Sequence, residues 1–193
     1  MFVGNSITLH GRLESIGWFA DWGMAASKPE NDYVHILMKK IKEKREDSSF
    51  CICQVSSWER SYKEGKEKYP LYESARNFDA DIIVMRFVEN CAENDFDKDV
   101  FKKEMSNLLD YLNPSGKAKF VLTTGFWHHP GDEVIIEFAK ENEYPLAILG
   151  DLGDNDEMMA KGLFEHSGIE VHPGDLGMKN IANRIYEKLE NYL

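Results

Sequence analysis

Short apolar runs alternate with longer segments of helical periodicity along the whole chain of 193 residues. Five of these runs are rich in β-branched and apolar residues, which is typical of parallel strands buried on both faces. They lie at Met1–Gly4, Phe50–Val55, Asp81–Phe87, Lys119–Thr123 and Leu146–Leu149. Strands that alternate with helices through right-handed crossovers predict an α/β fold, a three-layer α/β/α sandwich around a five-stranded parallel sheet.

The segments between the predicted strands carry apolar residues three and four positions apart, the spacing of an amphipathic helix. The first of these helices is predicted to begin at a capping box, with Ser27 as the N-cap and Glu30 reaching back to it. Asp175 is expected to cap the last helix. The predicted buried stripes are Val34, Leu37, Met38, Ile41; Phe101, Met105, Leu108, Leu109, Leu112; Val134, Ile135, Phe138, Ala139; and Met178, Ile181, Ile185, Leu189, Tyr192.

No linker, repeat or low-complexity segment divides the chain, which predicts a single domain over residues 1–193. We predict the flavodoxin-like strand order 2-1-3-4-5. In that order the first strand is central, although only three residues precede Gly4. We therefore expect this strand to pair on both sides and to be the shortest. Either the natural start lies upstream of Met1 or the sheet tolerates a short central strand.

Composition narrows the class of protein. With 42% hydrophobic and 30% charged residues, the chain resembles an ordinary globular domain that needs neither disulfides nor metals to fold. Its net charge of −11 argues against nucleic acid as a partner. No apolar run approaches the ~20 residues of a membrane span, and the start lacks the features of a signal peptide. Cys51, Cys53 and Cys91 are expected to be free thiols, so the predicted location is the cytoplasm.

Two distant residues suggest a reaction. Ser6 closes the turn Gly4-Asn5-Ser6 after the first predicted strand, and His172 lies just before the last predicted helix. Both positions can meet at the edge of the sheet where the carboxyl ends of the strands collect. A serine hydroxyl becomes nucleophilic when a base removes its proton, and imidazole suits that role near neutral pH. Ser6 is thus a candidate nucleophile and His172 a candidate general base.

These residues resemble the sequence blocks of the SGNH/GDSL hydrolases, serine esterases and lipases on a flavodoxin-like sheet. Gly4-Asn5-Ser6 is similar to their first block, with Asn5 where Asp is commonest, and Val88-Glu89-Asn90-Cys91 matches Gly-x-Asn-Asp in part. The resemblance implies an oxyanion hole formed by the Ser6 N–H and the Asn90 amide. The glycine of the second block is missing, so the N–H of Ser56 or Ser57 would replace it; we assign Ser57.

The last block is similar to the run around His172-Pro173, but Ile169 occupies the position of the usual aspartate. Because an isoleucine side chain accepts no hydrogen bond, the second ring nitrogen of His172 needs another partner. We expect a Ser6–His172 dyad whose imidazole donates to a backbone carbonyl near Ile169 or to water. Glu170 is the alternative orienting acid.

Four tryptophans follow predicted strands and are expected to line the substrate pocket: Trp18, Trp22, Trp58 and Trp127. Since flat aromatic faces stack on sugar rings, an acylated carbohydrate is the preferred substrate. His128, His129 and Asp132 do not project together at their spacing, so no metal is expected. The proposed chemistry requires no cofactor.

The sequence therefore predicts a serine esterase that acts through an acyl-enzyme on a small-molecule or carbohydrate ester, without a nucleic-acid or membrane partner; the oligomeric state stays open. One alternative is a non-catalytic flavodoxin-like binding module. Another is a flavodoxin or a receiver domain, but the segment after the first strand, Ser6-Ile7-Thr8-Leu9-His10, has neither a Ser/Thr-rich phosphate loop nor an acidic pair.

Overall fold

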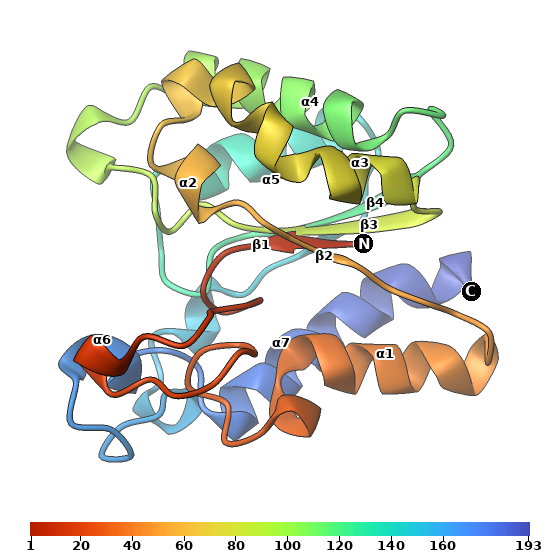
Figure 1. Ribbon diagram of the computed structural model, residues 1–193. Coiled ribbons are helices and arrows are strands. Elements are labelled where there is room, and N and C mark those ends of the chain that lie inside the picture. Colours follow the sequence, from red (N-terminus) through yellow and green to blue (C-terminus); the bar gives the residue numbers. More distant parts are fainter.

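In the computed structural model, which describes residues 1–193, five strands form one parallel sheet in the order β2-β1-β3-β4-β5 (Figure 1). This confirms the predicted fold class and strand order. β4 has the predicted bounds, and the other four strands are shorter than predicted. The strands are β1 (Phe2–Gly4), β2 (Ile52–Gln54), β3 (Ile82–Arg86), β4 (Lys119–Thr123) and β5 (Leu146–Ala147).

The short first strand is central, as predicted. Phe2 in β1 lies opposite Ile52 of β2 on one side and Val84 of β3 on the other. The expectation that β1 is the shortest strand is wrong, because β5 has only two residues. Successive side chains of a strand point to opposite faces, so Phe2 packs into the apolar cluster on one side of the sheet and Val3 into the cluster on the other.

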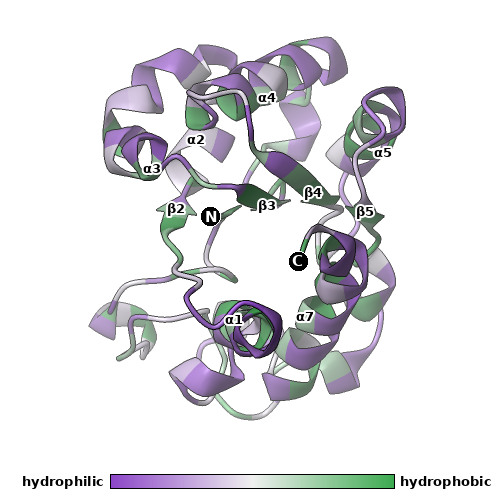
Figure 2. Ribbon diagram, turned by 90° about the vertical axis from the view of Figure 1, so that its right-hand side faces the viewer, coloured by the Kyte–Doolittle hydropathy of each residue, from purple (hydrophilic) through white to green (hydrophobic).

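Helices cover both faces of the sheet (Figures 1 and 2). The helices α1 (Tyr33–Lys44) and α7 (Asp175–Leu189) pack on one face. The opposite face is covered by α2 (Ser56–Glu59), α3 (Glu73–Phe78), α4 (Lys98–Leu112) and α5 (Gly131–Glu141). The single turn α6 (Ser167–Glu170) precedes α7. The predicted apolar stripes are buried, except for Tyr192, which lies beyond α7 and is only partly buried.

The crossover between β2 and β3 contains helical structure that the pattern did not predict. After α2, a 3₁₀ segment over Tyr62–Tyr72 leads into α3. Gly65 and Pro70 interrupt this stretch, and exposed lysines and glutamates separate its buried residues. Packing against α4 therefore defines this crossover, because the local periodicity is too weak to do so.

Two predicted helix ends are wrong. The N-cap of α1 is Asp32, whose side chain accepts the His35 N–H at 2.8 Å, and not Ser27. Ser27 instead donates its N–H and its hydroxyl to the Asp175 carboxylate, at 2.8 and 2.7 Å. Asp175 begins α7 but caps no helix. The carboxylate binds the loop that follows β1 to the start of α7. Ser6 begins that loop, and His172 lies just before α7.

The state of the cysteines and the length of the helices bear on the remaining predictions from the sequence. All three cysteines are free, and Cys53 and Cys91 are buried. None of the helices combines the length and the apolar character that crossing a bilayer requires.

Candidate active site

The structure brings Ser6 and His172 together at the carboxyl edge of the sheet. Ser6 lies in the turn directly after β1, and His172 lies between α6 and α7. The Ser6 Oγ and the His172 Nε2 are 2.9 Å apart. This distance is a normal hydrogen bond, and it is the geometry needed for a base to take the hydroxyl proton.

The other ring nitrogen of His172 faces a backbone carbonyl. The His172 Nδ1 lies 2.6 Å from the Gly168 carbonyl oxygen. Because a carbonyl can only accept, Nδ1 carries the proton and Nε2 is left as the acceptor for the Ser6 hydroxyl. The carbonyl is available because the last carbonyl groups of a helix have no intrahelical partner, and α6 is a single turn. The partners expected for this nitrogen were a backbone carbonyl, water or Glu170, and the structure shows a backbone carbonyl.

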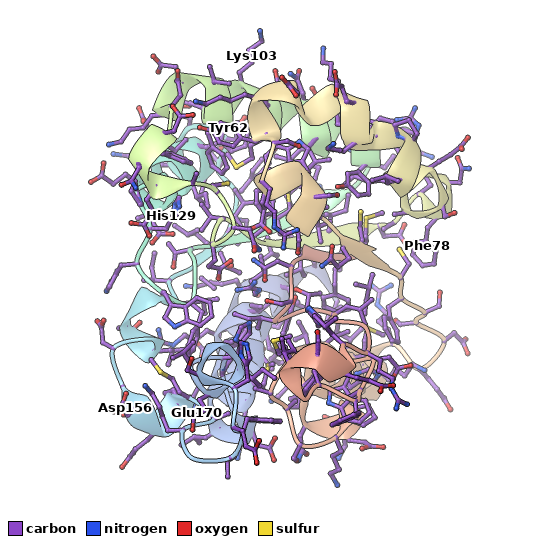
Figure 3. All side chains as sticks on the ribbon, turned by 60° about the vertical axis from the view of Figure 1, so that its left-hand side comes forward. Tyr62, Phe78, Lys103, His129, Asp156 and Glu170 are labelled. Atoms are coloured by element: carbon purple, nitrogen blue, oxygen red, sulfur yellow. The ribbon has the colours of Figure 1, made fainter.

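Neither neighbouring side chain supplies an acid to His172. Ile169 is fully buried in a small apolar cluster with Trp18 and Met24. Glu170 accepts the Gly162 N–H at 2.7 Å and makes no hydrogen bond with His172, so its predicted alternative role as orienting acid is wrong in this geometry. Figure 3 shows Glu170 among the loops of the lower layer.

The surroundings of His172 favour the neutral imidazole. Burial lowers the pKa of His172 to about 4, although the hydrogen bond to Gly168 opposes that shift. The ring of Trp127 packs edge-to-face against it, with the centroids 5.3 Å apart. A base that stays neutral at physiological pH can accept the serine proton.

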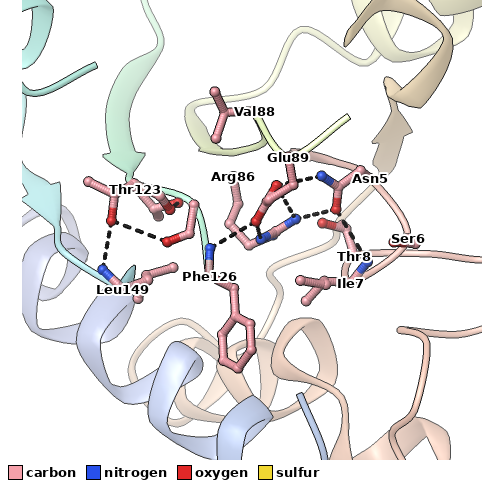
Figure 4. Close-up of polar contacts among 12 residues, drawn as sticks. Asn5, Ser6, Ile7, Thr8, Arg86, Val88, Glu89, Thr123, Phe126 and Leu149 are labelled. Atoms are coloured by element: carbon pink, nitrogen blue, oxygen red, sulfur yellow. Dashed lines mark hydrogen bonds and ion pairs between the residues drawn. The ribbon is translucent and has the colours of Figure 1, made fainter. Parts of the chain in front are cut away.

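A buried charge network holds the turn that carries Ser6 (Figure 4). The Asn5 Nδ2 donates to Glu59 at 3.0 Å and to Glu89 at 2.6 Å, and its Oδ1 accepts from Arg86. Arg86 also forms an ion pair with Glu89 at 2.6 Å. An aspartate at position 5 would offer no N–H to either carboxylate, so this network explains why an asparagine stands there.

The two carboxylates of this network differ in their tendency to ionise. Burial, reinforced by the charge of Glu89, raises the pKa of Glu59. Burial also opposes ionisation of Glu89, but the charge of Arg86 and hydrogen bonds from Arg86, the Phe126 N–H and Asn5 outweigh it and lower the pKa of Glu89. Sequence reasoning missed Glu59, Arg86 and Glu89, and the only available signal was an arginine inside a predicted buried strand.

Asn90 lies beside Ser6 in the same pocket. Its Nδ2 donates to the Glu59 Oε2 at 2.8 Å, which leaves the second amide hydrogen without a protein partner. Val88, two residues earlier, has a φ of 146°, a backbone conformation that favours glycine. Val88 thus adopts a backbone conformation typical of glycine, at the position where the Gly-x-Asn-Asp block has its glycine. The Val88 N–H donates to Glu59 at 2.6 Å and helps to hold this conformation.

The structure distinguishes between Ser56 and Ser57, the two candidates for the third oxyanion donor. The Ser56 N–H donates to the Gln54 side chain at 3.1 Å and is therefore occupied. The N–H groups of Ser57 and Ser6 donate to no other protein group. The Ser57 hydroxyl bonds to Tyr72 at 2.9 Å, which fixes this residue at the pocket wall.

The pocket around this pair is small and polar. Its volume is about 370 Å³, near the lower end of ligand pockets. Only one of its nine lining residues is hydrophobic, and none is acidic: Ser6, His10, Met24, Gln54, Ser56, Ser57, Arg60, Asn90 and His172. A larger cavity of about 890 Å³ lies at the opposite edge of the sheet, away from Ser6 and His172.

The predicted aromatic pocket is wrong, because none of the four tryptophans lines the cavity around Ser6. Trp18 is 2% exposed and Trp58 is 0% exposed, so both belong to the core. Trp22 is partly buried and donates its Nε1–H to the Ala26 carbonyl. Trp127 is also partly buried and contacts the imidazole of His172.

The two histidines after β4 have structural partners within the protein. His129 bonds through its ring to the Cys91 carbonyl and the Gly131 N–H, and Asp132 accepts the N–H groups of Gly125 and His129. His128 pairs with Asp154 at 3.1 Å. No group of three or more potential metal ligands is clustered in the molecule.

The fold of this chain, a parallel sheet with helices on both faces, is similar to that of solved structures described as esterases and as a G-D-S-L family protein. The chain is similar to an acetyl xylan esterase, AlAXEase, with 18% identity, a TM-score of 0.59 and coverage of 97% of this chain and 98% of the other. It is also similar to a G-D-S-L family protein from Desulfitobacterium hafniense, with 12% identity, a TM-score of 0.56 and 97% coverage of both chains.

A two-domain esterase (CEX) active on acetylated mannans has 15% identity and a TM-score of 0.62, with coverage of 98% of this chain. This chain spans about half the length of that esterase, 47%. At such low identities these similarities show the fold alone. Comparison with protein-family models gives no match, and neither does comparison with the curated proteins.

Proposed function

We propose that this protein hydrolyses an ester through an acyl-enzyme formed on Ser6. The observation that carries the proposal is the 2.9 Å contact between the Ser6 Oγ and the His172 Nε2. The Gly168 carbonyl fixes the tautomer of His172 in which Nε2 is free to accept. The fold supports the proposal, since the solved structures described above include esterases.

The first half of the proposed reaction transfers the acyl group. His172 Nε2 takes the proton of Ser6 while its Oγ attacks the ester carbonyl carbon. The negative charge that develops on the carbonyl oxygen is stabilised by the N–H groups of Ser6 and Ser57 and by the free amide hydrogen of Asn90. The tetrahedral intermediate then expels the alcohol, which receives the proton from His172.

The second half releases the acid. His172 takes a proton from water, the resulting hydroxide attacks the acyl-Ser6 carbonyl, and the same three donors stabilise the second oxyanion. The proton returns to Ser6 as the carboxylic acid leaves. The imidazolium formed in each half is held by the Gly168 carbonyl and not by a carboxylate.

The substrate class proposed here is a short acyl ester of a polar alcohol, such as an acetylated sugar. A pocket of about 370 Å³ with a single apolar lining residue offers no slot for a long acyl chain. Two of the solved structures of similar fold are described as an acetyl xylan esterase and as an esterase active on acetylated mannans, which supports the same class.

A fluorophosphonate probe and a panel of p-nitrophenyl esters and acetylated sugars test this proposal. We expect the probe to label wild type at Ser6, and Ser6→Ala and His172→Ala each to lower kcat/KM by at least about 10³-fold. Ser115→Ala, at an exposed turn, is the matched control. A folded protein without labelling or turnover would instead support the non-catalytic binding module.

A further inference from the structure

Arg60 differs from every other arginine of this chain. It directly follows α2, its side chain is exposed, and its guanidinium makes no ion pair, hydrogen bond or aromatic contact. The guanidinium groups of all the others bind a carboxylate or a backbone carbonyl: Arg12, Arg45, Arg76, Arg86 and Arg184. An unpaired arginine is notable in a chain with 34 acidic and 23 basic side chains.

This free cation lines the pocket of Ser6 and His172. No aspartate or glutamate lines the same pocket, so no side chain there competes for the guanidinium. His10, another lining residue, donates Nδ1–H to the Gly11 carbonyl at 2.7 Å, so that its Nε2 is left for a hydrogen bond with a hydroxyl group. The pocket thus presents one positive charge and several neutral polar groups to a substrate.

A guanidinium group has a preferred ligand chemistry. Its planar fork of N–H donors matches the two oxygens of a carboxylate, and such charge-assisted pairs are stronger than neutral hydrogen bonds. A neutral ester leaves this charge without a counter-ion. Since the whole chain carries a net charge of −11, its general field disfavours an anionic substrate, and a local cation at the site offsets that repulsion.

We propose that Arg60 forms an anion subsite that binds a carboxylate of the ester substrate beside the Ser6–His172 pair. This inference rests on the proposed esterase function and extends it to a narrower substrate class. The carboxylate belongs either to the alcohol part, as in an acetylated uronic acid, or to the acyl part, as in a hemisuccinate.

Two matched pairs of esters test the subsite and distinguish the two sources. The first pair is 4-acetoxybenzoate and 4-acetoxybenzamide, and the second is 4-nitrophenyl hemisuccinate and 4-nitrophenyl succinamate. For at least one pair we expect wild type to have a kcat/KM ratio, anionic over neutral, of about five or more. In Arg60→Gln that ratio falls about fivefold, the loss expected for an ion pair at an exposed side chain. Arg60→Lys, which keeps the charge without the fork, gives an intermediate ratio.

Lys103→Gln removes the same charge at an exposed position of α4 and should leave both ratios as in wild type. The subsite is refuted if neither anionic ester is preferred, or if Arg60→Gln leaves both ratios unchanged. If wild type hydrolyses none of the four esters and no fluorophosphonate labels it, the esterase proposal itself fails.

A binding measurement tests the subsite independently of turnover. In NMR titrations of the wild-type protein, D-glucuronate should shift the resonances of pocket residues at lower concentration than glucose does. Arg60→Gln should remove that difference, and Lys103→Gln should keep it. Equal responses to both sugars in wild type would overturn the anion subsite even if the protein proved to be an esterase.

Discussion

The two walls of the pocket are built in different ways. The nucleophile wall, formed by the Ser6 turn and the segment around Asn90, rests on buried side chains linked by charge and by many hydrogen bonds: Asn5, Glu59, Arg86 and Glu89. The base wall contains His172, a single-turn helix and an apolar cluster. There the imidazole has one hydrogen bond besides that to Ser6, to the Gly168 carbonyl.

This difference shows where each wall obtains its stability. In the nucleophile wall, buried donors and buried acceptors are paired with one another. Removing one residue of this network therefore leaves a buried charge without its partner. In the base wall, packing positions His172, and no carboxylate forms a hydrogen bond with its imidazole. The nucleophile wall should therefore respond to substitution mainly in stability and transition-state binding, and the base wall mainly in its pH dependence.

The largest expected effect is that of Arg86→Met. Arg86 is fully buried and forms an ion pair with Glu89, so the substitution leaves Glu89 uncompensated in the core. We expect the free energy of unfolding to fall by about 3–5 kcal/mol in urea denaturation. Arg184→Met, which removes a surface pair with Asp151, is the control and should cost about 1 kcal/mol or less. Equal losses in the two variants would contradict the structural role of the buried network.

Asn90→Ala should reduce catalysis strongly. Loss of one oxyanion donor typically lowers kcat by about 10²–10³-fold. Because the Asn90 amide also donates to buried Glu59, we expect a further loss of about 1–3 kcal/mol in unfolding free energy. Asn107→Ala removes an amide that donates to buried Glu104 away from the site and serves as the control. If Asn90→Ala keeps the wild-type kcat, Asn90 is not an oxyanion donor, and its only role is the hydrogen bond to Glu59.

The pH profile tests the base wall. Burial lowers the pKa of His172 to about 4, and the neutral imidazole is the active form, which predominates above that pKa. The kcat/KM should thus be lost only as the pH falls through about 4. At pH 5 about 90% of the plateau value should remain, compared with about 3% for a histidine of ordinary pKa, 6.5. Circular dichroism at each pH checks folding, and a midpoint near 6.5 would refute the buried, neutral base.

The smallest effect is expected for Glu170→Gln. The Glu170 carboxylate accepts the Gly162 N–H and does not contact His172, and the glutamine carbonyl can keep that hydrogen bond. The expected decrease in kcat/KM is less than about tenfold, compared with about 10⁴ for loss of a triad acid. Glu165→Gln, an exposed neighbour, is the control. A thousandfold loss with unchanged stability would restore Glu170 as the acid and end the contrast between the walls.

The sequence by itself determined the architecture and the positions of the reactive pair. The strands, layers and helical stripes follow from hydrophobic periodicity, which is a local signal that burial imposes on each element. The strand order was predicted from the flavodoxin-like arrangement that alternating strands and helices commonly adopt. The placement of Ser6 after β1 and of His172 before α7 brings both to one edge because parallel strands share the direction of their carboxyl ends. The sequence also showed that the side chain of Ile169 offers no hydrogen-bond acceptor to His172.

Only the tertiary structure decided how that pair is supported. Asn5, Glu59, Arg86 and Glu89 come from three separate segments, and no local pattern indicates that they share a buried site. The four tryptophans follow strands, as predicted, but packing draws Trp58 and Trp18 into the core. Hydrogen bonds between distant polar groups and the filling of space depend on which segments meet, and that information arises only when the chain is folded.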